Sequence, residues 1–234
     1  VEKSELFIGQ HAGCLRDGEL LSLPGVDCVT SIDFDQSLNY AAACGQGHHL
    51  MTHAEQAAVS LWCWKNGFMP RGNTAYGRSS DATFETGRRA DKKSPGDTSG
   101  SARTLTGSGP ASWRHNNNPN GIADLCGNVW EWRGGMRLVD GEIQVLANNN
   151  AADSKNSQTK ASSAWRAISA STGELVAPGS AGTLKYDASA AGTTTAHGAP
   201  VLSDAVSNRN GEAGSDEHTP GSTAGAFEKI TSKA

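Results

Sequence analysis

The sequence lacks the features that mark nucleic-acid-binding and membrane proteins. Its densest group of positive charge is Arg88, Arg89, Lys92 and Lys93, its formal net charge is -4 and its pI is near 6.0. A nucleic-acid surface needs a denser basic patch, so we interpret this group as part of a solvated loop and expect no nucleic-acid partner. No apolar run approaches the roughly 18 to 20 residues of a membrane-spanning helix, so we expect no insertion into a membrane.

Paired cysteines are also missing. The cysteines are odd in number and widely spaced, and no C-x-x-C pair occurs among Cys14, Cys28, Cys44, Cys63 and Cys126. Neither a disulfide framework nor a zinc knuckle is therefore indicated, and we expect buried, reduced thiols. Aromatic residues make up 6% of the chain whereas 28 residues are glycine, which favours a loop-rich rather than a helical protein.

What the sequence does contain is a mixture of short strand and helix signals, which predicts an α+β fold with two helices, short antiparallel strands and much irregular structure. Residues 5–9 and 18–23 predict an opening hairpin. Apolar residues at helical spacing predict a first helix over residues 34–44, with Gly45 as its stop.

A second helix is predicted from His53 to Asn66. Thr52 followed by Glu55 is a capping-box pattern at its start, and Gly67 ends it. The face that we expect to be buried carries Ala54, Ala58, Leu61 and Trp62.

Two histidines near this helix suggest a metal ion. His49 and His53 are four residues apart with Glu55 close by, which suits a pair of ligands on one helical face. Because the predicted helix begins at His53, His49 lies before it and off that face. A histidine metal site is therefore the less favoured interpretation.

Long irregular segments surround these elements. Residues 70–114 are rich in glycine, serine, threonine and arginine and predict a long surface loop, which is either functional or mobile. Residues 134–146 predict a hairpin with Asp140-Gly141 at its tip. Residues 189–234 are too poor in apolar side chains to fold alone, so we expect an extended or partner-wrapping tail. The predicted organisation is one domain over residues 1–188 followed by this tail.

The densest chemistry of the chain lies in Gly121-Ile-Ala-Asp-Leu-Cys-Gly-Asn-Val-Trp-Glu-Trp132, which we call the central motif. It holds two tryptophans, two carboxylates, an asparagine and two glycines in twelve residues. Gly127 permits a positive φ or a close backbone approach, and Asn128 tolerates the same region. Residues 129–132 then predict a short strand with Trp130 and Trp132 on one face.

The central motif resembles the G-L-x-D-M-x-G-N-V-W-E-W signature of the formylglycine-generating-enzyme/sulfatase-modifying-factor family. The resemblance implies a C-type-lectin-like fold. It also implies a calcium site formed by the side chains of Asp124 and Glu131 and the carbonyls of Gly127 and Val129, and oxygen ligands of this kind suit a hard cation. In the alternative interpretation Asp124 caps the turn and Glu131 pairs with an arginine, Arg133 or Arg137, without a metal.

The sequence departs from the family at the positions that decide activity. The family's C-terminal patterns, R-G-G-S-W and G-F-R, do not occur, and the family's enzymes place their catalytic cysteines in that part. Cys126 lies inside the central motif, where we expect it to serve packing. We therefore expect a protein that is not an enzyme, with an oxidase of the formylglycine-generating type or an iron-dependent relative as the alternative.

The general plan of residues 1–190 resembles the non-catalytic branch of the family, which includes phage tail-fibre and receptor-binding proteins. This resemblance implies a virion protein that assembles in the bacterial cytoplasm, is exposed on the particle and is oligomeric with other virion proteins. Its expected ligand is a host surface glycan or protein. A capsid-decorating structural protein is a second alternative.

Asparagine-rich runs supply the candidate ligand-binding residues. Amide side chains offer both donors and acceptors to a sugar, although such runs are also common in turns. The candidates are Trp113, His115, Asn116, Asn117 and Asn118 before the central motif, and Asn148, Asn149 and Asn150 after the second predicted hairpin.

Overall fold

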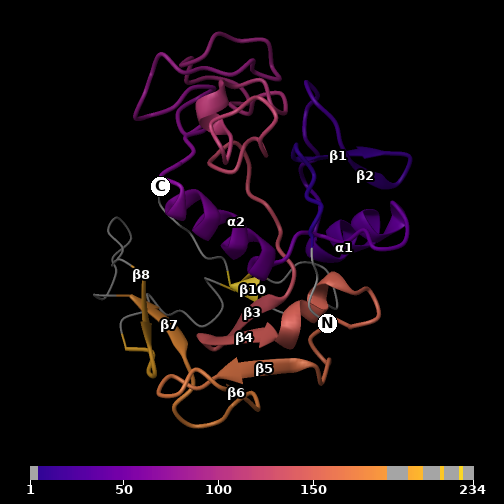
Figure 1. The fold of residues 1–234 in the computed structure, drawn as a ribbon, viewed down its shortest axis with the longest axis vertical. Coiled ribbons are helices and arrows are strands. Elements are labelled where there is room, and N and C mark those ends of the chain that lie inside the picture. Colours follow the sequence, from indigo (N-terminus) through magenta and orange to yellow (C-terminus); the bar gives the residue numbers. More distant parts are fainter. Residues whose placement is uncertain (1–4, 189–199, 208–216, 219–226, 229–234) are drawn as a thin grey trace. The chain divides into compact units, whose positions relative to one another are not determined.

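The computed structural model describes residues 5–188, 200–207, 217–218 and 227–228 (Figure 1). Its contacts divide the chain into two compact units, which we describe separately. Among the described residues, unit 1 consists of residues 5–32 and 36–132, and unit 2 consists of residues 33–35 and those from 133 to 228. The predicted α+β class with two main helices, antiparallel strands and much irregular structure is confirmed. The predicted boundary at residue 188 stays a prediction.

Unit 1 begins with a hairpin of β1 (Gly13–Arg16) and β2 (Glu19–Ser22), which pair antiparallel. Asp17 and Gly18 form its tip with φ of 51° and 86°, the positive φ values of a two-residue type I′ turn. The prediction of a first strand over residues 5–9 is wrong, because this aspartate-glycine turn pairs β2 with the residues directly before it.

The helices are α1 (Phe34–Ala43) and α2 (His53–Lys65), close to their predicted bounds. The capping box of α2 is confirmed. The Glu55 N–H donates to Thr52 Oγ1 at 3.2 Å, and the Thr52 N–H donates to Glu55 Oε2 at 3.0 Å. His49 contacts the same carboxylate, with Nε2 at 2.9 Å from Glu55 Oε1.

The predicted buried face of α2 is wrong. Its buried residues are Glu55, Val59 and Cys63, at a spacing of four. Ala54, Ala58, Leu61 and Trp62 are exposed instead. The physical reason lies in the cap, since Glu55 turns inward to close the capping box and therefore sets the face on which residues four and eight positions later are buried.

The predicted strand over residues 129–132 is also wrong, because these residues form no strand. The Val129 N–H donates to the Gly127 carbonyl at 3.0 Å, which turns the backbone out of an extended path. The two tryptophans do not share an environment. Trp130 is 69% exposed, whereas Trp132 is half-buried and donates from Nε1 to the Ile32 carbonyl at 2.9 Å.

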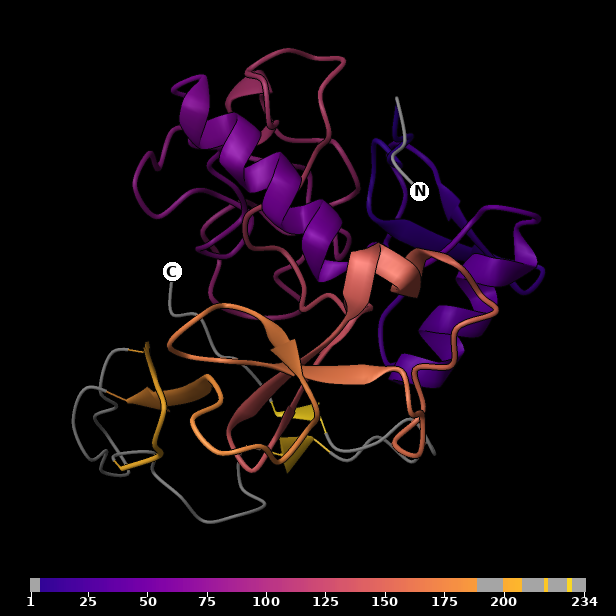
Figure 2. The same ribbon diagram turned by 60° about the horizontal axis from the view of Figure 1, so that its bottom comes forward.

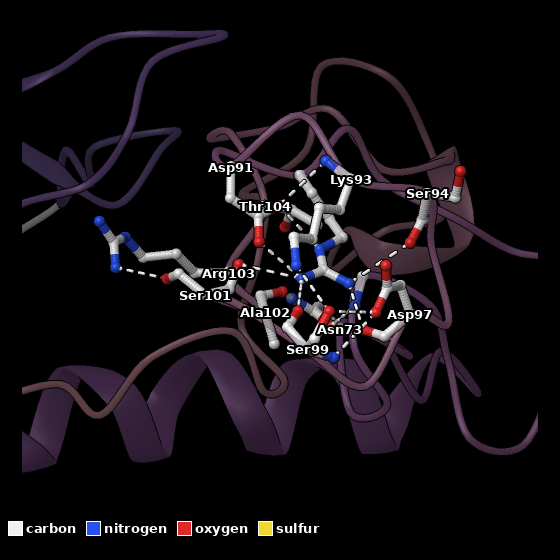
Figure 3. Close-up of polar contacts among 12 residues, drawn as sticks. Asn73, Asp91, Lys93, Ser94, Asp97, Ser99, Ser101, Ala102, Arg103 and Thr104 are labelled. Carbon is white, nitrogen blue, oxygen red and sulfur yellow. Dashed lines mark hydrogen bonds and ion pairs between the residues drawn. The ribbon is translucent and has the colours of Figure 1, made fainter.

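The loop over residues 70–114 is held by buried polar side chains. Arg89, whose side chain is fully buried, forms a two-pronged ion pair with Asp91 at 2.7 and 3.0 Å. It also donates to the carbonyls of Ser94 at 3.3 Å, Ser99 at 2.6 Å, Ser101 at 3.5 Å and Asp97 (Figure 3). One guanidinium thus joins five points of a segment that has almost no regular structure, in addition to the backbone hydrogen bonds within the loop.

Unit 2 is built on a six-stranded antiparallel sheet (Figure 2). Strand β4 lies at its centre and pairs with β3, β5 and β7, while β6 adds to β5 and β8 to β7. The strands are β3 (Met136–Val139), β4 (Glu142–Leu146), β5 (Trp165–Ile168), β6 (Leu175–Val176), β7 (Lys185–Ala188) and β8 (Pro200–Ser203). The predicted hairpin with Asp140-Gly141 at its tip is confirmed as β3 and β4.

Two further strands, β9 (Glu217–His218) and β10 (Phe227–Glu228), pair antiparallel. The rest of the predicted tail, apart from residues 200–207, lies outside the described residues, so its expected wrapping of a partner stays a prediction. None of the helices in the described parts of the chain has the length and apolar content needed to cross a membrane.

The core of unit 2 combines an apolar cluster with buried charge. Leu146, Ala151 and Trp165 form the cluster, and the Arg137 guanidinium lies 4.6 Å from the Trp165 ring centroid, a cation-π contact. Glu142 is buried at the start of β4. Its carboxylate accepts bonds from Thr183 Oγ1 at 2.6 Å, the Gly179 N–H at 3.0 Å and Gln144 Nε2 at 2.7 Å.

Candidate functional site

The central motif is tied to the 70–114 loop by an amide network. Asn128 Oδ1 accepts from the Thr104 N–H at 2.7 Å and from Asn73 Nδ2 at 3.0 Å. Asn73 in turn accepts the Gly77 N–H at 2.6 Å and donates to the Ala102 carbonyl at 2.8 Å. The asparagine of the motif therefore organises the loop beside it, a role that only the folded chain reveals.

Two glycines allow the motif and the loop to approach closely. A Cβ on Gly72 would lie 1.8 Å from the Cys126 carbonyl oxygen, and one on Gly127 would lie 2.3 Å from the Asn73 carbonyl oxygen. Gly127 also has a φ of 71°, as its position in the sequence predicts. Burial raises the pKa of the Cys126 thiol, and the charge of Asp81 raises it further, so this thiol is held in its neutral form.

The predicted calcium ligands have different surroundings. Asp124 is buried, and its Oδ2 accepts the Gly107 N–H at 2.7 Å. Burial raises the pKa of Asp124, while the Gly107 bond and the charges of Arg114 and His11 act against this rise. Glu131 is exposed. The structure thus gives Asp124 a donor and a neighbouring cation without a metal, which favours the interpretation of Asp124 as a loop cap.

The calcium prediction also involves the Gly127 carbonyl and, in its alternative, an arginine partner of Glu131. The Gly127 carbonyl accepts the Val129 N–H, which leaves one lone pair for a second partner. Arg137, one of the two arginines considered as a partner of Glu131, donates to Gln144 Oε1 at 2.8 Å and to the Lys160 carbonyl at 2.9 Å. Within the described residues no three His, Cys, Asp or Glu side chains gather as a metal site. The calcium site of Asp124, Gly127, Val129 and Glu131 stays a prediction.

A cleft of about 490 Å³ opens beside Asp124 in unit 1. Its lining includes Gln10, His11, Arg88, Thr106, Gly107 and Arg114. The cleft draws on three distant parts of the chain, and backbone bonds join them. The Ala123 N–H donates to the Gln10 carbonyl at 2.8 Å, and the Gly25 N–H donates to the Thr106 carbonyl at 2.8 Å.

One wall of the cleft carries fixed positive charge. Arg114 is buried and donates from Nη1 to the Gly121 carbonyl at 2.9 Å and from Nη2 to the Gly107 carbonyl at 3.1 Å. Asp124 lies close enough for its charge and that of Arg114 to influence each other. Two backbone carbonyls therefore hold the guanidinium of Arg114 in place.

His11 is the residue of the cleft with an unmet bonding need. Its Nδ1 is buried and has no hydrogen-bond partner, a condition that typically costs about 1 to 3 kcal/mol. The ring packs against Gly107, where an added Cβ would lie 2.6 Å from Nδ1. Burial lowers the pKa of His11, Arg114 lowers it further and Asp124 opposes the change. No pattern in the sequence points to His11, because its neighbours Arg114 and Asp124 lie about a hundred positions away.

The asparagine-rich run before the motif forms turns. Asn116 Oδ1 accepts the Asn118 N–H at 3.1 Å, and Asn118 Oδ1 accepts the Asn120 N–H at 3.0 Å. Asn117 has a φ of 51°. These are the side-chain bonds of successive Asx turns, so the turn interpretation explains the run without a ligand.

Trp113 and His115, also predicted to bind a ligand, differ in how deeply they are buried. Trp113 is 1% exposed and donates from Nε1 to Glu85 Oε2 at 3.1 Å, so it packs in the core of unit 1 rather than at the surface. His115 is half-buried, packs 5.0 Å from the Trp62 ring and accepts the Ile122 N–H on Nδ1 at 2.8 Å. Burial lowers the pKa of His115.

The second asparagine run belongs to unit 2. Asn148, Asn149 and Asn150 lie in the 3-10 segment Ala147–Ala152, where Asn148 and Asn149 have φ of 55° and 54°. Asn148 and Asn150 are exposed. Their role in ligand binding stays a prediction.

No protein-family model matches the sequence, and no curated protein matches it either. The fold and the cleft therefore carry the functional argument together with the resemblance of the central motif.

Proposed function

We propose that this protein is a non-enzymatic binding module with a C-type-lectin-like domain, exposed on a phage virion, that contacts a host surface glycan or protein through the cleft of unit 1. The observation that carries the proposal is the cleft itself, which is polar, open and built on loops that buried side chains hold in place. A display module needs a surface of this kind, because binding residues are commonly carried on loops that a rigid scaffold positions. The resemblance of the central motif supplies the scaffold and the virion context.

Three thiols support a non-enzymatic role. Burial raises the pKa of Cys28 to about 11 and also raises the pKa of Cys63 and Cys126. A nucleophilic or metal-binding cysteine needs the opposite change, toward the thiolate. These cysteines are suited to packing, as the sequence predicts.

An adsorption assay tests the proposed function. The full chain, assembled with the particle component that carries it, is applied to host cells and to a glycan array. We expect binding that Pro119→Trp abolishes, because exposed Pro119 lines the cleft and a tryptophan there would fill its mouth. Pro178→Trp, at an exposed position of unit 2, is the matched control and should bind normally. Failure of the assembled wild-type protein to bind any host envelope would refute the proposal.

A second candidate is a structural virion protein, such as a capsid-decorating protein. The exposed apolar residues of α2 and the segment after it favour it, since Leu61 is 64%, Trp64 73% and Met69 72% exposed. Large exposed apolar groups that lie together commonly mark contacts with other chains. If Trp64→Ser prevented incorporation into the particle while isolated Trp64→Ser protein kept its adsorption to cells, the structural role would be supported beside the binding role.

A further inference from the structure

The cleft of unit 1 has an unbalanced set of charges. Its lining includes two arginines, Arg88 and Arg114, and His11, and it includes no aspartate or glutamate. The Asp124 carboxylate, next to the lining residue Gly107, already accepts the Gly107 N–H on Oδ2. The cleft therefore faces solvent with positive charge although the whole chain has a net charge of -4.

The two arginines have different freedom. Arg114 is buried and fixed by the carbonyls of Gly121 and Gly107. Arg88 is exposed, and its side chain makes no hydrogen bond or ion pair within the described residues. Its backbone is nevertheless anchored, because its N–H donates to Ser108 Oγ at 2.9 Å and its carbonyl accepts the Leu105 N–H at 2.8 Å. The guanidinium of Arg88 is thus free to move, while the backbone that carries it is held in place.

The position of Arg88 directs this free group to the cleft. Its Nη2 lies 3.4 Å from the place of a Cβ on Gly25, and Gly25 and Arg88 both line the cleft. A guanidinium presents parallel N–H groups that match the two oxygens of a carboxylate. Arg88 can therefore bind an anionic group in the cleft. The positive charge of Arg114, in the wall of the cleft, attracts the same group.

His11 adds a polar group to the lining of the cleft. Its Nδ1 is buried and packed against Gly107, so this nitrogen faces away from a ligand. The other ring nitrogen, Nε2, makes no hydrogen bond within the described residues. A hydroxyl group next to an anionic centre would supply a partner for Nε2.

We propose that the cleft binds the carboxylate of an acidic sugar, such as a uronic or sialic acid residue in a surface glycan, with Arg88 as the mobile ligand-binding group and Arg114 as the fixed one. The volume of about 490 Å³ is suited to one or two sugar rings. The sugar hydroxyls would bond to His11 and to the amide of Gln10. The inference rests on the proposed function for the source of the sugar, and it adds the chemical class of the ligand.

Titration of the full-length protein with glucuronate tests the inference directly, with glucose as the neutral probe of equal ring size. We expect glucuronate to bind at least tenfold more tightly than glucose, and we expect this preference to weaken as salt is added because exposed charges are screened. Arg88→Ala should reduce glucuronate affinity about tenfold or more. Arg88→Lys should retain part of it, because lysine keeps the charge but loses the paired geometry.

Arg16→Ala is the matched control. Arg16 is an exposed arginine of unit 1 outside the cleft lining, and its Nη1 donates to the Leu15 carbonyl at 2.9 Å. Its removal should leave glucuronate binding unchanged. Unchanged near-UV circular dichroism of Arg88→Ala shows that the variant is folded. The inference is overturned if glucuronate does not bind, if glucose binds equally well, or if Arg88→Ala binds like wild type.

Further outcomes of these binding experiments distinguish a failure of this inference from a failure of the proposed function. Tighter binding of inorganic sulfate or phosphate than of glucuronate would overturn the assignment to a carboxylated sugar. Binding of neutral glycans alone on the array, unaffected by Arg88→Ala, would leave the display function standing and overturn the inference. Arginine-dependent glucuronate binding without any adsorption to host envelopes would support the inference and refute the display function.

Discussion

The 70–114 loop of unit 1 and the sheet of unit 2 satisfy the hydrogen bonds of their backbone polar groups in different ways. In the sheet, backbone N–H and carbonyl groups pair with one another along β3, β4 and β5. In the loop, scattered backbone bonds such as that from the Ala90 N–H to the Arg103 carbonyl are supplemented by bonds from a few buried side chains. Among these side chains, Arg89 reaches the carbonyls of four residues. Both arrangements satisfy buried polar groups, as folding requires.

The two regions should respond differently when a single side chain is removed. A ladder of backbone bonds depends little on any one side chain, whereas a network built around one charged group fails when that group is removed. Even the sheet contains one such point, Glu142, where three donors converge on a buried carboxylate. The comparison therefore predicts large effects at the side chains that hold several groups and small effects elsewhere.

The largest effect is expected for Arg89→Ala. It would leave Asp91 and the carbonyls of Ser94, Asp97 and Ser99 without their shared donor. Removal of one partner of a fully buried ion pair costs about 3 to 5 kcal/mol, and because Asp91 is partly exposed we expect a loss near the lower end, about 3 kcal/mol. Urea unfolding gives the change in free energy, and hydrogen exchange locates it, with loss of protection expected in peptides from 70–114 rather than from 136–146.

Two variants sharpen this test. Arg88→Ala, at the exposed neighbouring arginine, should change the free energy of unfolding by less than about 0.5 kcal/mol. Arg89→Lys should not restore stability, because an ammonium group cannot reach the same set of carbonyls. Wild-type stability of Arg89→Lys would mean that charge alone holds the loop.

A smaller effect is expected for Glu142→Gln in unit 2. The amide keeps one acceptor oxygen but presents N–H groups to the donors of Thr183 and Gly179. Hydrogen bonds to charged groups contribute about 1.5 to 3 kcal/mol, so we expect a loss of about 2 kcal/mol. Glu174→Gln, at an exposed carboxylate of the same unit, should be neutral. Protection from exchange should fall in β4 and leave the 70–114 loop unchanged.

Gly72→Ala tests the contact between the loop and the central motif. The added methyl would lie 1.8 Å from the Cys126 carbonyl oxygen, so the two segments must move apart. Overpacking of this kind costs about 1 to 3 kcal/mol. Gly173→Ala, where the added methyl meets nothing within 4 Å but φ is 74°, measures backbone strain alone. Gly72 has no positive φ, so its loss should come from the contact alone, and a Gly72→Ala variant as stable as wild type would show that the close approach has no energetic role.

Glu142 should also affect how the free energy of unfolding depends on pH, and we expect this effect to be smaller than those above. Burial acts to raise its pKa, but the bonds from Thr183, Gly179 and Gln144 outweigh it and the net pKa is lowered from its ordinary value of 4.5. A carboxyl with a lowered pKa in the folded state stabilises the protein above the ordinary value, and this stability is lost as pH falls through the folded pKa. Unfolding free energies measured from pH 6 down to pH 3 should therefore fall less steeply in Glu142→Gln than in wild type.

The smallest effect concerns the ion. Since Asp124 already has the Gly107 N–H and the charge of Arg114 beside it, we expect thermal midpoints in calcium and in chelator to agree. Asp124→Asn with Glu131→Gln serves as the control. A calcium-dependent rise in wild type that this double variant loses would establish the predicted calcium site, since binding to the native state alone adds to its stability.

Several features of the fold follow from residues that are close in sequence. The capping box of Thr52 and Glu55 fixes the start of α2, and Asp140-Gly141 fixes the β3-β4 hairpin. Gly127 adopts the positive φ that its motif predicts. These predictions succeed because the interactions involved span only a few residues, so the sequence alone contains both partners. The Asp17-Gly18 turn gave the same kind of signal, which the predicted opening hairpin overlooked.

The rest was decided by the tertiary structure. The buried face of α2, the central place of Arg89 in its loop and the meeting of His11 with Arg114 and Asp124 all depend on groups far apart in the chain. An arginine is solvated or buried according to whether carbonyls from other segments converge on it, and spacing along the sequence does not report this. The local elements and the glycine turn of the central motif therefore follow from neighbouring residues, whereas the cleft and its charge exist only because the folded backbone brings three distant segments together.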